Sequence, residues 1–201
     1  VGSFPPPYGG NSVHVRRLSA LLSEIYDVRV IDVNGSPVDT DPPSVIRCGT
    51  LLPLNLAKAC FYLRTREPQI AHFHVSAMKN FVIAGNLLIR ALPRSCKRMI
   101  TIHSGSFVST FHSGGWLKAQ MSTSLLRGFD CIIVVNDKQR ELLVEIGCVP
   151  ERVFVLPAFL PPLAVASPVV VELIKRIAGA GKQLLVSSGY GQEHYGYHHI
   201  A

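Results

Sequence analysis

Paired cysteines and long apolar segments, which define whole classes of protein, are missing from this 201-residue sequence. Its five cysteines are odd in number, widely spread and never spaced as CxxC. This argues against a disulfide scaffold or a zinc ribbon and favours a reducing compartment. The longest uncharged segments, 99–117 and 153–171, are interrupted by glycine and histidine or by four prolines, so neither predicts a membrane-spanning helix.

Acidic residues are also scarce, with 13 Asp and Glu against 20 Lys and Arg, a net charge of +7 and a pI near 9.4. This balance favours anionic partners such as phosphorylated ligands or acidic lipids. The basic residues are scattered, and no nucleic-acid-binding motif is present, so we expect no nucleic-acid partner. With no basic-then-apolar leader, we expect a cytoplasmic protein, and peripheral contact with the inner face of a membrane stays open.

Short apolar runs alternate with helical patterns along most of the chain. Near-continuous apolar strands are typical of parallel sheets buried on both faces, so the alternation predicts a doubly wound α/β domain. Strands are expected at 28–33, 70–75, 99–103, 131–135, 153–156 and 184–187, and helices at 13–25, 54–65, 78–92, 116–127 and 137–147.

The same pattern predicts the domain organisation. Residues 1–160 would form the main domain, with an incomplete first strand because Val1 lies directly before a glycine loop and a helix. Residues 161–181 would be a linker and connecting helix, and 182–201 the start of a second, truncated domain.

Two glycines, Gly9 and Gly10, precede the first expected helix. Glycine allows close backbone approach to a ligand, and free N–H groups at a helix start attract phosphate. The alternative is a tight strand-to-helix turn, because the GxGxxG pattern is absent.

Polar residues follow several of the expected strands, at the edge where open α/β sheets bind ligands. His103, Ser104 and Gly105 lie at such a strand end, where His103 would bind substrate, act as an acid or base, or merely cap the loop. His72 and His74 share one strand face like a metal pair, but no Asp, Glu or Cys stands beside them at ligand spacing. We therefore expect no metal, and we expect His74 to line a cleft.

Asn136 follows another strand at the same edge. It is expected either to cap the next helix or to contact the cleft.

Several segments in order resemble family 4 of the nucleotide-sugar-dependent glycosyltransferases, which are retaining enzymes with the GT-B fold. The string 2–15 resembles the family's opening glycine loop, and 101–105 resembles its T-x-H-G segment with Ser104 inserted. Further matching segments are 72–76, 134–136, 147–157 and 185–201. The resemblance covers essentially the whole chain.

This resemblance implies a two-domain enzyme whose first, Rossmann-like half shapes the acceptor site. By analogy Gly9 and Gly10 would approach the donor diphosphate, and His103 would contact the transferred sugar or its phosphate. The acceptor side would be lined by His74, Ser76, Ser104, Gly105 and Asn136. No cofactor or metal is expected, the nucleotide-sugar being a co-substrate.

One departure from the family pattern concerns the donor site. The family binds its donor with a Glu-x7-Glu motif, and no two glutamates here have that spacing. We therefore expect the chain to be the first part of a transferase, inactive without a carboxy-terminal domain. The alternatives are a non-catalytic domain that binds a glycan or an anion, or another GT-B-shaped enzyme such as an epimerase.

The acceptor is left open between a glycan, a lipid-linked molecule and a small molecule. For a lipid-linked acceptor, Phe107, Phe111 and Trp116 could face it; otherwise they are ordinary core or loop aromatics.

Overall fold

The computed structural model describes residues 1–51, 53–113, 115–157 and 172. The chain divides into a unit at Val1–Phe159 and a second at Leu160–Ala201. The expected linker at 161–181, the strand at 184–187 and the second-domain start at 182–201 lie outside the described residues, apart from Glu172.

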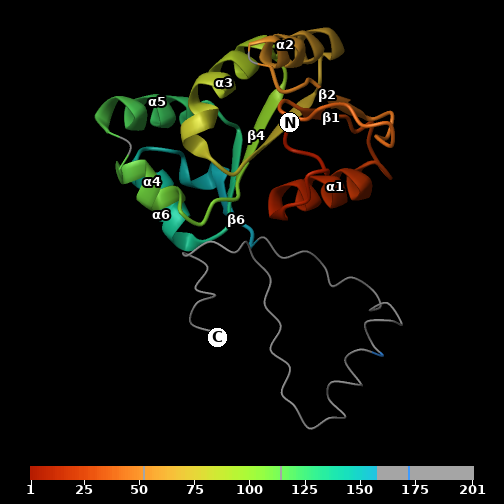
Figure 1. Cartoon of the computed structure of the whole chain (residues 1–201). Coiled ribbons are helices and arrows are strands. Elements are labelled where there is room, and N and C mark those ends of the chain that lie inside the picture. The colour runs from red at the N-terminus through yellow and green to blue at the C-terminus, as the bar shows by residue number, and fades with distance from the viewer. Residues whose placement is uncertain (52, 114, 158–171, 173–201) are drawn as a thin grey trace. The chain divides into compact units, whose positions relative to one another are not determined.

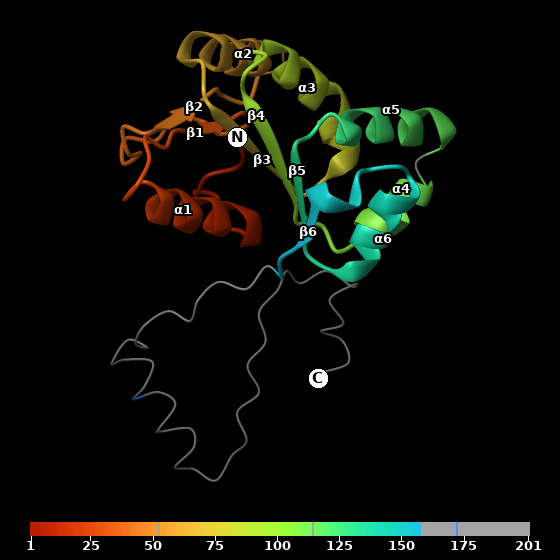
Figure 2. The same ribbon diagram turned by 180° about the vertical axis from the view of Figure 1, so that it is seen from behind.

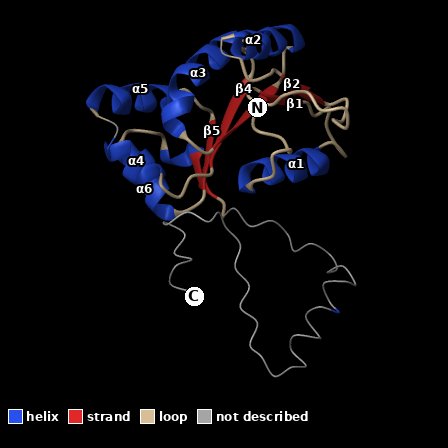
Figure 3. Ribbon diagram, in the orientation of Figure 1, coloured by secondary structure: helices blue, strands red, loops and turns tan. Residues whose placement is uncertain are grey.

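The described residues alternate between strands and helices (Figures 1 and 3). The strands are β1 (Val30–Asp32), β2 (Val45–Arg47), β3 (Ile70–Val75), β4 (Lys97–Ile102), β5 (Cys131–Val134) and β6 (Val153–Val155). The helices are α1 (Gly10–Leu22), α2 (Leu54–Arg66), α3 (Met78–Ala91), α4 (Phe107–Ser113), α5 (Trp116–Arg127), α6 (Asp137–Glu145) and the 3-10 turn η1 (Pro150–Arg152).

All strand pairs in the described residues are parallel. They form the pair β1-β2 and the four-stranded sheet β3-β4-β5-β6. Residues 1 and 2 lie between the two, because Gly2 N–H donates to the Ile31 carbonyl (3.1 Å) and His74 N–H donates to the Val1 carbonyl (2.8 Å). The start of the chain therefore occupies the expected first-strand position, and the parallel, Rossmann-like α/β fold is confirmed.

Helices cover both faces of these strands. Figures 1 and 2 show α1 across the strands from α3 and α5, while α2 packs against α3 and α3 against α5. Between the layers, Phe73, Ile100, Leu126 and Leu143 are fully buried. Burying such side chains supplies about 1.5–3 kcal/mol each and fixes the strands that carry the site.

The sequence pattern did not predict three of the observed elements: β2, α4 and η1. β2 has only three residues after Pro42-Pro43, too few for a periodic pattern, and it forms by pairing with β1. α4 is rich in Ser, Thr and Phe, which are weak helix formers, and it is held by Phe107, which is 2 % exposed. The turn η1 spans three residues only.

Candidate functional site

The carboxyl ends of β3 and β4 place two histidines side by side. His74 on β3 is in register with Thr101 on β4. His103 lies just beyond the end of β4, where its N–H donates to the Val75 carbonyl (2.8 Å) and extends the ladder by one bond. His103 was expected inside the strand, and its place one residue past the end points it to the ligand-binding edge of the sheet.

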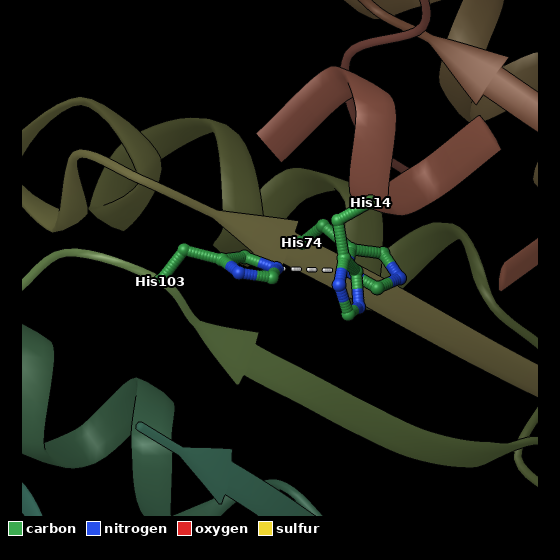
Figure 4. A group of neighbouring side chains, drawn as sticks. All are labelled: His14, His74 and His103. Carbon is green, nitrogen blue, oxygen red and sulfur yellow. Dashed lines mark hydrogen bonds between the residues drawn. The ribbon is translucent and has the colours of Figure 1, made fainter. Parts of the chain in front are cut away.

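Helix α1 brings a third histidine to the same place. His14 lies one turn into α1, and its ring centroid is 4.8 Å from that of His103 and 5.6 Å from that of His74. Figure 4 shows the three rings converging from α1, β3 and the segment after β4. His74 Nδ1 and His103 Nε2 share a hydrogen bond of 3.1 Å.

Burial favours the neutral form of all three imidazoles. Burial lowers the pKa of His103 to about 4, lowers that of His74 well below its usual range and also lowers that of His14. A neutral imidazole donates from one ring nitrogen and accepts at the other, so this group can bind hydroxyl groups without adding charge.

One fully buried nitrogen of the group has no hydrogen-bond partner among the described residues. His14 Nδ1 is buried and accepts or donates no hydrogen bond, and neither does Asn11 Oδ1, one turn earlier on the same helix. A buried polar atom left unpaired costs about 1–3 kcal/mol. Two such atoms thus lie in the first two turns of α1.

The ring nitrogens could also be considered as metal ligands. Those of His14, His74 and His103 lie within 4.8 Å of one another. Two ligands of a tetrahedral zinc ion at about 2.0–2.1 Å are only about 3.3 Å apart, so a metal would require the rings to move. The pair noticed in the sequence, His72 and His74, is not this group, because His72 Nε2 instead bonds Thr101 Oγ1 (2.7 Å).

The glycine loop forms the start of α1. Gly9 is the N-cap and its N–H donates to Ser12 Oγ (2.9 Å), while Val13 is the first residue bonded back to it. A Cβ built on Gly10 would meet nothing within 4 Å. The fold therefore does not require glycine at position 10. The space beside Gly10, at the N-terminus of the helix, is open.

A buried arginine that the sequence reading missed holds the loop before these glycines. Arg47 on β2, whose side chain is 1 % exposed, donates to the carbonyls of Phe4 (3.0 Å), Pro5 (2.7 Å) and Pro6 (3.0 Å). It also pairs with Asp32 (3.1 Å) and with Asp41 (2.7 Å). The approach to the helix start is thus set by contacts between residues more than forty positions apart.

The remaining predicted residues lie along the same edge. Asn136 is the N-cap of α6, and its Oδ1 accepts from the N–H of Gln139 (3.0 Å). The fully buried Gln139 in turn donates to the Ser104 carbonyl (2.6 Å), which fixes the segment after His103. Gly105 is exposed, and a Cβ there would meet nothing within 4 Å.

A pocket of about 380 Å³ lies between α3, α4 and α5 and reaches this edge. Ser76 and Ser104, which follow the two strand ends, are part of its wall. Its other described lining residues are Ala77, Met78, Val82, Ile83, Ser106, Phe107, Phe111, Leu117, Ala119, Met121 and Ser122.

The family model of the glycosyl transferase 4-like domain matches residues 9–158. The chain belongs to this family. No curated protein matches the sequence. Within the described part of this glycosyl transferase 4-like domain, no helix is long and apolar enough to cross a membrane.

In this glycosyl transferase 4-like domain, the structure brings His74 and His103 together with His14, which the sequence reading had given no role. His14 follows the paired glycines by four residues, so its position one turn into the expected helix was a usable signal. Gln139 and Arg47 carried no local signal, because their importance arises from contacts distant in sequence.

Proposed function

We propose that this domain is the acceptor-side half of a retaining glycosyltransferase that moves a sugar from a nucleotide-sugar to an acceptor hydroxyl. A second domain would bind most of the donor, since the Glu-x7-Glu motif is absent from this sequence. The observation that carries the proposal is the group of neutral histidines, with an unpaired His14 Nδ1, beside the N-terminus of α1.

The first role concerns the leaving group. In transfer, the bond from the anomeric carbon to the donor phosphate breaks, and negative charge develops on the nucleoside diphosphate. The first-turn N–H groups of α1 and the positive end of its dipole suit that charge, and the space at Gly10 lets a phosphate approach. No metal or other cofactor is needed for this arrangement.

The second role concerns the sugar and the acceptor. His103 would bind the transferred sugar or its phosphate, with its ring held by the hydrogen bond to His74. Ser76, Ser104, Gly105 and Asn136 lie on the same edge, next to where the acceptor hydroxyl must approach. This assignment agrees with ligand binding at the carboxyl ends of parallel strands.

The test compares the 201-residue chain with the native polypeptide purified from its source, whose intact mass shows whether a second domain follows. Both are given UDP-, GDP- and ADP-sugars with mixed acceptors, and released nucleoside diphosphate and glycosylated product are measured. We expect transfer by a native polypeptide of about twice this mass and none by the 201-residue chain. Release without acceptor would indicate an epimerase or hydrolase instead, and ligand binding without turnover by a native chain of 22.0 kDa would indicate a binding module.

A further inference from the structure

The rings of His14, His74 and His103 converge from three separate elements (Figure 4). One ring nitrogen from each residue lies within 4.8 Å of those of the other two. Imidazole nitrogen is a good ligand for Zn²⁺, Cu²⁺ and Ni²⁺, and three histidines with an open fourth position are an established ligand set for Zn²⁺. The group therefore has the donor atoms of a transition-metal site.

Two of the nitrogens already have the separation that a metal ion requires. His74 Nδ1 and His103 Nε2 lie 3.1 Å apart. Two nitrogens bound tetrahedrally to Zn²⁺ at about 2.0–2.1 Å lie about 3.3 Å apart. Pairing of β3 with β4 holds the two residues at neighbouring strand ends. The sheet thus preforms two of the three ligand positions, and an ion would replace the hydrogen bond between them.

The third ligand comes from α1. The nitrogen of His14 has to come at most about 1.5 Å nearer to the other two to reach the same spacing. A change in the side-chain torsions of His14 can supply such a movement while the helix stays in place. His14 Nδ1 has no hydrogen-bond partner among the described residues, so no bond of that atom is lost when the ring moves.

Binding requires a change of tautomer but no net release of protons from neutral rings. A neutral imidazole carries its proton on one nitrogen, and a ligating nitrogen must be unprotonated. The proton that now lies between His74 Nδ1 and His103 Nε2 therefore moves to the other nitrogen of the ring that carries it. All three residues are partly exposed, so an ion can reach them from solvent.

We propose that His14, His74 and His103 form a binding site for one tetrahedral Zn²⁺ ion, with the fourth position open to water or to an anion. The ion is an additional ligand of this group and not a cofactor of the transfer. It would occupy nitrogens that the sugar needs at His103, so Zn²⁺ should inhibit the transferase. This inhibition rests on the proposed function, whereas the metal site itself does not.

Co²⁺ is the probe for the binding test, because it substitutes for Zn²⁺ and absorbs visible light strongly when it is tetrahedral. We expect the 201-residue chain to give this absorption with Co²⁺, and Zn²⁺ to remove it. Zn²⁺ should also raise the melting temperature, because the site exists only in the folded chain. The absence of tetrahedral absorption would overturn the proposal. A thiolate-to-cobalt band in the near ultraviolet would also overturn it, by placing the ion on cysteine.

Variants locate the ion. His14→Phe keeps a ring but no nitrogen, and His103→Ala removes another ligand. Each should weaken Co²⁺ binding at least about tenfold, because even residues that only support a metal ligand contribute about 10–100-fold to affinity. His72→Gln is the matched control, since His72 lies on the same strand as His74 but bonds Thr101, and it should bind Co²⁺ like the parent. Unchanged binding in both His14→Phe and His103→Ala, with circular dichroism like that of the parent, would overturn the proposal.

A second control concerns three further histidines, His194, His198 and His199, which lie outside the described residues. Their side chains are also capable of binding metal ions. The variant in which all three are changed to Asn should keep the tetrahedral Co²⁺ absorption. Loss of the absorption in this variant would place the ion on these residues and overturn the proposal.

A transfer test separates the metal site from the proposed function. The native polypeptide is assayed with its nucleotide-sugar, with Zn²⁺ and then with added EDTA. Zn²⁺ at about ten times its Kd should raise the KM for the nucleotide-sugar about tenfold and reversibly. His14→Phe should need at least about tenfold more Zn²⁺ for the same effect.

The outcomes distinguish the two ideas. Co²⁺ binding at the histidines with no transfer from any nucleotide-sugar would overturn the transferase while the metal site stands. Transfer without Co²⁺ binding would overturn the metal site alone. Transfer that saturating Zn²⁺ leaves unchanged, with Co²⁺ bound at the histidines, would overturn the inhibition and the contact of His103 with the sugar.

Discussion

His74 Nδ1 and His103 Nε2 lie 3.1 Å apart across the carboxyl ends of two neighbouring parallel strands. The contact holds one proton between two neutral rings, so each ring orients the other. His14 closes the group from α1 with its Nδ1 unpaired. The result is a preorganised, uncharged hydrogen-bonding surface beside a helix N-terminus, which suits a sugar next to a phosphate.

Replacing His103 tests the catalytic assignment. His103→Ala should lower kcat of the native polypeptide about 10²-fold or more, because the transferred sugar loses a positioned hydrogen-bonding partner. Initial rates of nucleoside diphosphate release measure this. His72→Gln is the control, since His72 bonds Thr101 and should leave kcat within about twofold. Full activity of His103→Ala would remove His103 from the mechanism.

A methyl group added at Gly10 should weaken donor binding without destabilising the fold. Because nothing lies within 4 Å of a Cβ there, Gly10→Ala should unfold at the same or slightly higher urea concentration, with a gain of up to about 1 kcal/mol. It should raise the KM for the nucleotide-sugar about tenfold by blocking phosphate approach. Gly105→Ala, also in open space, should leave the donor KM unchanged. An unchanged donor KM in Gly10→Ala would mean that the phosphates bind elsewhere.

Removing the arginine under the glycine loop should destabilise the domain. Arg47→Ala leaves Asp32 buried without its cation and deprives the carbonyls of Phe4 and Pro5 of their donor, so we expect a loss of about 3–5 kcal/mol in urea unfolding. The control is Arg29→Ala, whose pair with Asp27 is solvent-exposed and should cost less than about 1 kcal/mol. Similar losses in the two variants would show that Arg47 does not hold the loop.

The buried histidines should make stability fall in mild acid. Burial lowers the pKa of His103 to about 4 and that of His72 to about 3. The unfolded chain, with a histidine pKa near 6.5, therefore takes up protons that the folded chain excludes. After allowance for partial solvent exposure, the free energy of unfolding should drop by about 2 kcal/mol from about pH 7 to about pH 5.

Urea titrations across this range measure that slope. The double variant His72→Gln/His103→Gln should reduce this slope, because its unfolded state has two fewer sites that take up protons between about pH 6.5 and about pH 4. His14 and His74, whose pKa values burial also lowers, should keep the remainder of the slope. An unchanged slope in the double variant would assign the acid sensitivity to other groups.

Much of the fold followed from local pattern. The apolar runs around Phe73, Ile100 and Ile132 indicated parallel strands buried on both faces. Each forms a parallel strand with a helix after it, but in β3 and β5 buried residues alternate with less buried ones. His74 and His103 were predicted as site residues because they lie near the carboxyl ends of expected strands, and parallel strands present these ends at one edge of the sheet. β2 escaped notice because three residues carry no periodicity and only pairing with β1 makes them a strand.

The amino-acid order alone specified the parallel α/β fold, its family and two of the three histidines, because periodicity and strand ends are properties of neighbouring residues. The approach of His14, the contacts of Arg47 with the glycine loop and the apolar pocket beside Ser76 were decided by tertiary packing. They join segments tens of residues apart, and no local propensity records which side chains meet when helices close over a sheet.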